Sequence, residues 1–342
     1  MRARELGISI GDGRQGRWNA ITDINGVRVG HATIVEGEAV RTGVTVILPP
    51  TLPLFAGCHR LNGNGELTGL EWVRESGLLT TPVGITNTFS VGVVRDAIAA
   101  RSADPDTWAL PVVGETYDGF LSDIRGQHVS SAHVDAAFAS ASGEAVAEGN
   151  VGGGTGMICH GFKGGVGTAS RLVSDYTVGV LVQANYGRRN RFRVDGIPVG
   201  EIIGERIPAP EAPVRDSGPG EGVRGNREVP PTDDQGSIIG IVATDAPLLP
   251  QQCDRLAQRA GLGVARMGGT GAHSSGDLFL AFATGNAGLE SEEGEIPLRM
   301  LADPEVSRFY DAVIESIEEA ILNALLAAET MTGRDGHTAY RL

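Results

Sequence analysis

The order of apolar and polar positions along the chain predicts strands that alternate with helices. Short runs rich in β-branched residues and bounded by Gly, Pro, Asn or Asp are typical of β-strands. One of them, "YTVGVLVQANYG", is apolar enough for a buried central strand. The predicted strands lie at residues 26–34, 43–49, 83–89, 176–187, 238–244 and 277–284.

Four segments instead repeat their apolar residues at the helical spacing of about 3.6. Residues 130–148 are Ala-rich with a Ser that can cap the start, and residues 250–266 have Pro in the first turn. The longest helix begins at Asp303-Pro304 and is expected to end near Gly333. The four helices are predicted at 91–101, 130–148, 250–266 and 303–333, and the buried stripe of the last is Phe309, Val313, Ile317, Ile321 and Leu325.

Residues 208–235 interrupt this pattern with six Pro and four Gly in 28 positions and almost no large apolar side chains. Such a composition is typical of a linker or an exposed loop. Strands and helices alternate on both sides of it, and no internal repeat is present. We therefore predict one α/β domain with a covered sheet, interrupted by a loop that can move or be cut.

Composition narrows the classes of function. The 342 residues include 50 Gly, are 41% hydrophobic and carry a net charge of −14, which argues against nucleic acid or an anionic membrane as partner. No apolar run reaches 18 residues and no signal peptide is recognised at the N-terminus, so we expect a cytoplasmic protein. Cys58, Cys159 and Cys253 lie far apart, which suits unpaired thiols in a reducing compartment.

Several familiar catalytic motifs are absent. The Gly-rich segment 149–171 contains Lys163, but the order of residues around it does not match the phosphate-binding GxxxxGK[ST] loop. The seven His residues form no HExxH motif or other metal-ligand spacing, and no GxSxG nucleophile motif occurs. The sequence therefore predicts neither a metal site nor a cofactor.

Ser237 in "TDDQGSIIGIVATDAP" is the remaining candidate nucleophile. A Gly-Ser pair before a strand is commonly a turn residue and the first strand residue. If the peptide bond after Gly236 is cut, however, the new α-amine of Ser237, with a pKa of about 7.7 to 8.0, becomes a base on the same residue as the hydroxyl. The preceding loop and the following strand, which begins at residue 238, fit this arrangement.

The segment "GSIIGIVATDAPLLPQQCDRLAQRAGLGVARMG" resembles the start of the small subunit of the DmpA-type aminopeptidases, which include L-aminopeptidase/D-esterases and β-peptidyl aminopeptidases. The resemblance extends over nearly the whole chain, in the same order. It is carried by "ITDINGVRVGHATI", "VVGETYDGFLSDI", "GNVGGGTGMICHGFKGGVGTASR", "VLVQANYG", "SSGDLFLAFATGN" and "GRDGHTAY".

The resemblance implies a precursor that cuts itself between Gly236 and Ser237. Residues 1–236 would form a large subunit with the loop at 208–235, and residues 237–342 a small subunit that begins with the nucleophile. Together they would make one domain, a four-layer α/β/β/α sandwich of the type shared with ornithine acetyltransferase. A homotetramer of cleaved protomers without metal or organic cofactor is also implied.

The resemblance also assigns roles to individual residues. Ser275 and Asp277 would act as a hydroxyl relay backed by a carboxylate, and Asn185 would belong to the oxyanion hole. Without the family, Ser275 and Asp277 are typical of a turn before a strand, and Asn185 is typical of the end of one. Some family members have Glu where this chain has Asp277, so the sequence does not decide whether the shorter side chain makes direct contact.

Three further residues are expected to contact the substrate. Glu115 and Tyr117 in "GETYDG" match a site that holds the substrate's free amino group and touches the reacting centre. Trp108 is a candidate apolar wall, with a core tryptophan as the alternative.

The implied activity is removal of an N-terminal residue from short peptides, amino-acid amides or esters through an acyl-enzyme on Ser237. Two other classes remain open: an acyltransferase of the ornithine acetyltransferase type, and a non-catalytic relative. Sequence does not choose among L-amino amides, D-amino esters and β-peptides, because one methylene changes binding by only about 1 to 3 kcal/mol.

Overall fold

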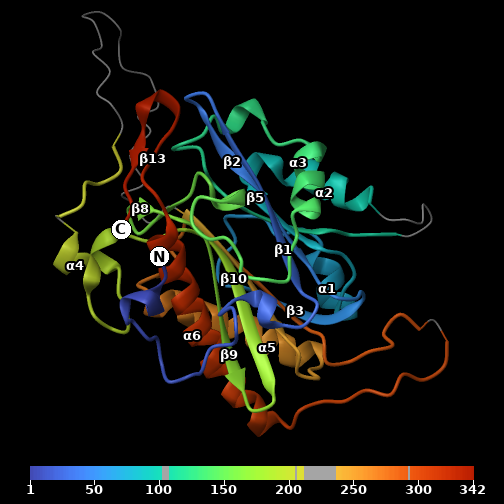
Figure 1. Ribbon diagram of the computed structural model, residues 1–342. Helices are drawn as coiled ribbons and strands as arrows, with labels where there is room; N and C mark the ends of the chain where they lie inside the picture. Colours follow the sequence, from blue (N-terminus) through green and yellow to red (C-terminus); the bar gives the residue numbers. More distant parts are fainter. Residues whose placement is uncertain (102–107, 205, 212–235, 292) are drawn as a thin grey trace, which may run out of the picture.

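Two β-sheets lie face to face at the centre of the computed structural model, which describes all residues except 102–107, 205, 212–235 and 292 (Figure 1). The smaller sheet has the order β1-β2-β5-β6, and the larger has the order β4-β3-β12-β11-β10-β9. The strands are β1 (Arg28–Glu36), β2 (Val40–Leu48), β3 (Leu54–Arg60), β4 (Leu78–Leu79), β5 (Val83–Asn87), β6 (Val112–Thr116), β9 (Gly165–Val173), β10 (Tyr176–Asn185), β11 (Gly236–Thr244) and β12 (Ser275–Ala283). Two short hairpins pair β7 (Ile158–Cys159) with β8 (Phe162–Lys163) and β13 (Met331–Thr332) with β14 (Thr338–Ala339).

Helices cover the outer faces of both sheets. Helices α2 (Val91–Ala99) and α3 (Ser131–Ala139) pack on the smaller sheet, while α5 (Pro250–Arg266) and α6 (Asp303–Ala327) pack on the larger one (Figure 1). Two shorter helices are α1 (Leu70–Ser76) and α4 (Val199–Ile203). The order of layers is therefore α/β/β/α, as predicted.

Alternation of side chains along β11 and β12 separates two parts of the core. Ile239 and Leu278 belong to the cluster between the two sheets, whereas Ile238 and Phe279 belong to the cluster under α5 and α6. Strand side chains point alternately to opposite faces. Each other residue of β11 and β12 can therefore be assigned either to the face toward the smaller sheet or to the face under α5 and α6. This assignment decides below which site residues can meet.

All six predicted strands are observed, and no strand end differs from the prediction by more than three residues. The five residues predicted as the apolar stripe of the last helix are buried. Strands β3, β6 and β9 were not predicted. Strand β9 lies within the Gly-rich segment and packs against α6.

Two predicted helices are shorter than expected. The helix predicted at 130–148 ends at Ala139, because the following residues turn back and Ser142 pairs with Val29 of β1. The helix predicted to reach Gly333 ends at Ala327. There the Asn150 side chain binds both backbone groups of Glu329, at 2.9 Å and 3.1 Å, and replaces the next helical turn.

Most of the predicted loop, from residue 212 to residue 235, lies outside the described residues. Among the helices that the structure describes, none has both the length and the apolar character that crossing a membrane requires.

Candidate active site

Ser237 lies at the beginning of β11, in the middle of the larger sheet. It pairs with Asn185 of the antiparallel strand β10 and with Gly276 of the parallel strand β12, and it is 4% exposed. The preceding residue, Gly236, has φ of +150°, and a Cβ atom there would lie 2.2 Å from the Asn185 carbonyl oxygen. Only glycine fits this backbone, so the Gly-Ser order is required by the packing of the chain.

Asn185 is directly opposite Ser237, so the two side chains lie on the same face, with Cβ atoms about 5 Å apart. The Asn185 Oδ1 atom accepts a hydrogen bond of 2.8 Å from the backbone N–H of Ile158. A backbone N–H can only donate, which fixes the carboxamide with its Nδ2 group on the other side. Within the described residues nothing engages Nδ2, and it can donate to an oxyanion beside Ser237.

Ser275 and Asp277 form the predicted pair: the Ser275 hydroxyl donates to Asp277 Oδ1 over 2.6 Å. Direct contact through the shorter carboxylate is therefore present. On β12, Ser275 and Asp277 alternate with their neighbours so that they share a face with Phe279, which lies under α5 and α6. On β11, Ser237 shares a face with Ile239, which lies between the two sheets. The Ser275 and Asp277 side chains therefore point to the opposite face of the sheet from the Ser237 side chain. This pair can approach the Ser237 nitrogen at the strand end, but not the hydroxyl.

Burial raises the pKa of Asp277, while its hydrogen bonds with Ser275, Asn62 and the backbone of Ile238 lower it. Asn62 also accepts a 2.7 Å hydrogen bond from the Asp277 backbone N–H through its Oδ1 atom. The loop after β3 thus holds the start of β12 in place. Asn62 was not predicted as a site residue; the signal in the sequence that could have indicated it is the polar run "LNGNGE", which is typical of a loop.

Glu115 is 3% exposed at the end of β6. Its Oε1 atom accepts a 3.1 Å hydrogen bond from the Glu66 backbone N–H, and its Oε2 atom accepts one from the Thr88 hydroxyl. Burial raises its pKa and both hydrogen bonds lower it. Each carboxylate oxygen still has a lone pair that could accept from an ammonium group.

A single glycine connects Glu115 with the nucleophile strand. A Cβ atom on Gly65 would lie 3.0 Å from Glu115 Oε1 and 3.1 Å from the Cα atom of Gly276, which is the β-sheet partner of Ser237. The backbone at Gly65 therefore lies between the Glu115 carboxylate of the smaller sheet and the strand that pairs with Ser237 in the larger sheet. The sequence placed both residues in the site but gave no sign of how close they lie.

Tyr117 and Trp108 are more peripheral. Tyr117 is 47% exposed just after β6, and Trp108 is 73% exposed, so the core alternative for Trp108 was wrong. The ring of Trp108 lies 5.7 Å from that of Trp72. No contact of either predicted residue with Ser237 is observed.

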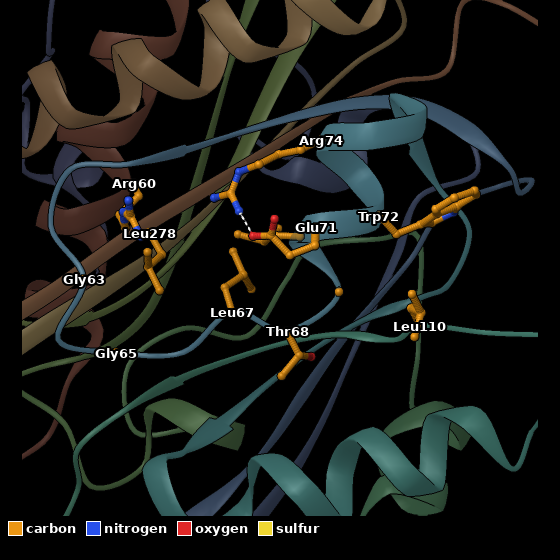
Figure 2. Close-up of a pocket in the computed structure, with 12 residues that line it drawn as sticks. Arg60, Gly63, Gly65, Leu67, Thr68, Glu71, Trp72, Arg74, Leu110 and Leu278 are labelled. Carbon is orange, nitrogen blue, oxygen red and sulfur yellow. Dashed lines mark hydrogen bonds and ion pairs between the residues drawn. The ribbon is translucent and has the colours of Figure 1, made fainter.

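An open pocket of about 440 Å³ lies beside this region, between α1 and the loop after β3. Figure 2 shows Arg60 and Leu278 at one end and Trp72 and Leu110 at the other. Gly65 lines the same pocket, so the pocket adjoins the backbone that touches Glu115.

Comparison with known proteins identifies this arrangement. The sequence profile of Peptidase family S58 matches residues 19–339. The chain belongs to this family. It is 47% identical over 362 residues to "Beta-peptidyl aminopeptidase BapA" of Sphingosinicella microcystinivorans, with coverage of 100% of this chain and 89% of the relative.

Solved structures agree in fold. A Burkholderia sp. β-aminopeptidase superposes with a TM-score of 0.88 and 51% identity, over 100% of this chain and 96% of that one. The L-aminopeptidase D-Ala-esterase/amidase of Ochrobactrum anthropi, described as a variant of the Ntn hydrolase fold, gives 0.85 and 40%, over 100% and 95%. The chain is therefore an aminopeptidase with the Ntn hydrolase fold, as the resemblance implied.

Proposed function

We propose that this aminopeptidase cuts itself between Gly236 and Ser237 and then uses Ser237 as an N-terminal nucleophile. The observation that supports this most directly is the position of Ser237. It lies at the start of a central strand, follows a glycine that no other residue can replace, and faces Asn185. In self-cleavage the Ser237 hydroxyl attacks the Gly236 carbonyl carbon, the C–N bond breaks, and the resulting ester is hydrolysed by water. The products are a carboxylate on Gly236 and a free α-amine on Ser237.

The same groups then act on substrate. The Ser237 hydroxyl attacks the substrate carbonyl and passes its proton to the Ser237 α-amine, while Asn185 Nδ2 donates to the oxyanion. The leaving amine or alcohol takes the proton, and an ester on Ser237 remains. Water attacks this ester, releases the N-terminal residue and restores the hydroxyl. The Ser275–Asp277 pair, on the opposite face, is suited to stabilising the protonated α-amine.

The free amino group of the substrate is assigned to Glu115, because a buried carboxylate near Ser237 matches an ammonium group next to the reacting carbonyl. Tyr117 and Trp108 are kept as contacts with the substrate. Among substrate classes we place N-terminal β-amino acid residues first. A curated relative at 47% identity and a solved structure at 51% identity carry that activity in their names. L-amino amides and D-amino esters follow, as for the Ochrobactrum anthropi enzyme.

The resemblance also supports a homotetramer of cleaved protomers, and we place the protein in the cytoplasm. The three free cysteines suit a reducing compartment. A size-exclusion and light-scattering measurement decides the assembly: a mass near four times 35.6 kDa is expected, and a monomer would refute it.

A substrate panel tests the proposed activity. Purified protein is given p-nitroanilides of a β-homoamino acid and of L-alanine, a D-alanine ester, the N-acetylated forms of all three, and acetylornithine with glutamate. We expect hydrolysis of the free-amine substrates and poor hydrolysis of the acetylated ones. Faster acetyl transfer to glutamate would favour the acyltransferase alternative, and no turnover of any substrate would favour the non-catalytic one.

A further inference from the structure

The only lysine of the chain is buried beside the candidate active site. Lys163 is one of 28 Lys and Arg residues in the sequence, and the other 27 are Arg. Its side chain is 0% exposed. Burying an ammonium group lowers the free energy of unfolding unless the group is fully hydrogen-bonded and an opposite charge lies nearby. The surroundings of Lys163 should therefore supply both.

The hydrogen bonds of Lys163 match an ammonium group. Its Nζ atom donates to the backbone carbonyls of Met157 at 2.8 Å, Gly164 at 2.9 Å and Gly154 at 3.4 Å. An ammonium has three N–H groups for these three oxygens, whereas a neutral amine has two. Lysine carries all of its donors on one nitrogen at the end of a flexible stem, whereas the guanidinium of arginine spreads its donors over three nitrogens in a plane.

Among the neighbouring charges, Asp118 favours the ammonium form of Lys163 most strongly. It is 0% exposed, and among the described residues neither of its carboxylate oxygens has a hydrogen-bond partner. Thr42 and Asn87 are near enough to lower its pKa, and Asn87 Nδ2 donates to the Thr42 hydroxyl oxygen at 2.7 Å. A Cβ atom on Gly156 would lie 2.7 Å from that of Asp118, so the carboxylate borders the same loop that Lys163 binds.

Burial disfavours the charged form of both residues, and at Lys163 the Asp118 charge opposes it. Burial lowers the pKa of Lys163 to about 7 while the Asp118 charge raises it. Burial likewise raises the pKa of Asp118 to about 7, with the Glu115 charge acting in the same direction. The other titratable groups at the pair are Cys159, beside Lys163, and Glu115, beside Asp118.

One peptide unit joins Lys163 to the oxyanion group. The carbonyl of Met157 accepts from Lys163 Nζ, and the N–H of the same peptide unit, that of Ile158, donates to Asn185 Oδ1 at 2.8 Å. Because the peptide group is planar, fixing its carbonyl fixes the direction of its N–H. The positive charge on the carbonyl also polarises that N–H and strengthens its hydrogen bond.

We propose that Lys163 and Asp118 are positioning residues for the oxyanion hole. The Lys163 ammonium, balanced by Asp118, holds the Met157–Ile158 peptide so that Asn185 presents Nδ2 to the reacting carbonyl at Ser237. This proposal rests on the proposed function for its catalytic consequence. The linkage from Lys163 through the peptide unit to Asn185 is a property of the fold alone.

A double-mutant cycle tests the catalytic consequence. Lys163→Met keeps the apolar part of the side chain and removes the charged Nζ, and we expect kcat to fall about 10- to 100-fold with KM changed less than about twofold. In an Asn185→Ala background the same substitution should lower kcat by less than about twofold, because the group it positions is already gone. Equal losses in both backgrounds would overturn the proposal. If the variants are processed slowly, the same cycle is read from the rate of self-cleavage.

A second measurement requires no activity. In the uncut Ser237→Ala protein, hydrogen exchange of the Ile158 amide is compared with and without Lys163→Met and Asp118→Asn. Asn323→Leu serves as control, because Asn323 is also a buried polar residue but binds Thr168 and Ala3 away from the site. We expect at least tenfold faster exchange at Ile158 in the first two variants and no change in the control. Unchanged exchange in Lys163→Met refutes the linkage, whereas an inactive wild type with this exchange pattern refutes only the proposed function.

Discussion

Replacing Glu115 by Gln tests how the enzyme selects a free N-terminus. The change removes one negative charge and keeps the size of the side chain. A charge-assisted hydrogen bond to a carboxylate contributes about 1.5 to 3 kcal/mol. Since about 1.36 kcal/mol corresponds to a factor of ten, kcat/KM for free-amine substrates should fall about 10- to 150-fold.

The structure also predicts what this substitution should leave unchanged. Burial raises the pKa of Glu115, so folding disfavours its ionised form, and removing the charge relieves that penalty. In Gln one of the two carboxylate oxygens is replaced by an NH2 group, which cannot accept a hydrogen bond. Either Thr88 or the Glu66 backbone N–H therefore loses its acceptor, which lowers the free energy of unfolding by about 1 kcal/mol. These effects oppose each other, and the free energy of unfolding should change by less than about 1 kcal/mol. Self-cleavage should continue, because the precursor has no free amine at this site.

The assay compares kcat/KM for a free and an N-acetylated p-nitroanilide, together with the processed fraction and the urea midpoint. Glu66→Gln is the matched control, because it removes the neighbouring carboxylate that does not face the substrate in this account. The control should keep its activity within about twofold. Normal hydrolysis of free-amine substrates by Glu115→Gln, or a block in its self-cleavage, would show that Glu115 is structural.

Two other substitutions and three treatments give independent tests. Asn185→Ala should lower kcat about 100- to 1,000-fold in steady-state assays, the cost of one oxyanion donor; unchanged kcat would remove Asn185 from the mechanism. Activity should fall as pH drops through the α-amine pKa of about 7.7 to 8.0. Activity should survive a chelator, and chelator inhibition that zinc reverses would contradict the mechanism. Activity should be lost when the Ser237 amine is acylated, and the one lysine of the chain is buried, so its side chain does not compete for the reagent. Arg171→Met should cost about 3 to 5 kcal/mol in denaturant unfolding, because Arg171 is fully buried and pairs with Glu315 and Glu319 at 2.9 Å and 2.7 Å; a loss below about 1 kcal/mol contradicts it.

The stability of the protein in acid should depend on the buried ion pair between Arg171 and Glu319. The interaction with Arg171 and Arg4 lowers the pKa of Glu319 below its model-peptide value of 4.5, despite burial. Its stabilising effect is therefore complete above pH 4.5 and is lost as the pH falls through the lower, folded-state pKa. Urea midpoints measured across this acidic range should fall, and those of Arg171→Met should fall less.

Periodicity in the sequence was sufficient for the α/β class, whereas the four-layer order was predicted from the family resemblance. The strands around Ile239 and Leu280 could be predicted because β-branched and apolar runs are local signals. Strand β9 was missed because its glycines, including Gly165 and Gly167, are typical of loops by composition. The end of α6 was missed because it is set by Asn150, more than 170 residues away in the sequence.

The site was predictable in its residue types but not in its geometry. The resemblance brought Ser237, Asn185, Ser275, Asp277 and Glu115 together. The face on which each side chain lies depends on strand register, which only the structure gives. That register separates the Ser275–Asp277 pair from the Ser237 hydroxyl. The part played by Lys163 depends on a single peptide unit, and no sequence motif encodes it.

Intact mass with N-terminal sequencing tests the central claim most directly. Residues 1–236 and 237–342 carry 236/342 and 106/342 of 35.6 kDa, or about 25 and 11 kDa. Wild-type protein should give these two masses and a second N-terminal sequence that begins Ser-Ile-Ile at Ser237, while Ser237→Ala should remain one inactive chain of about 35.6 kDa. Full activity in an uncut wild-type chain would contradict the account.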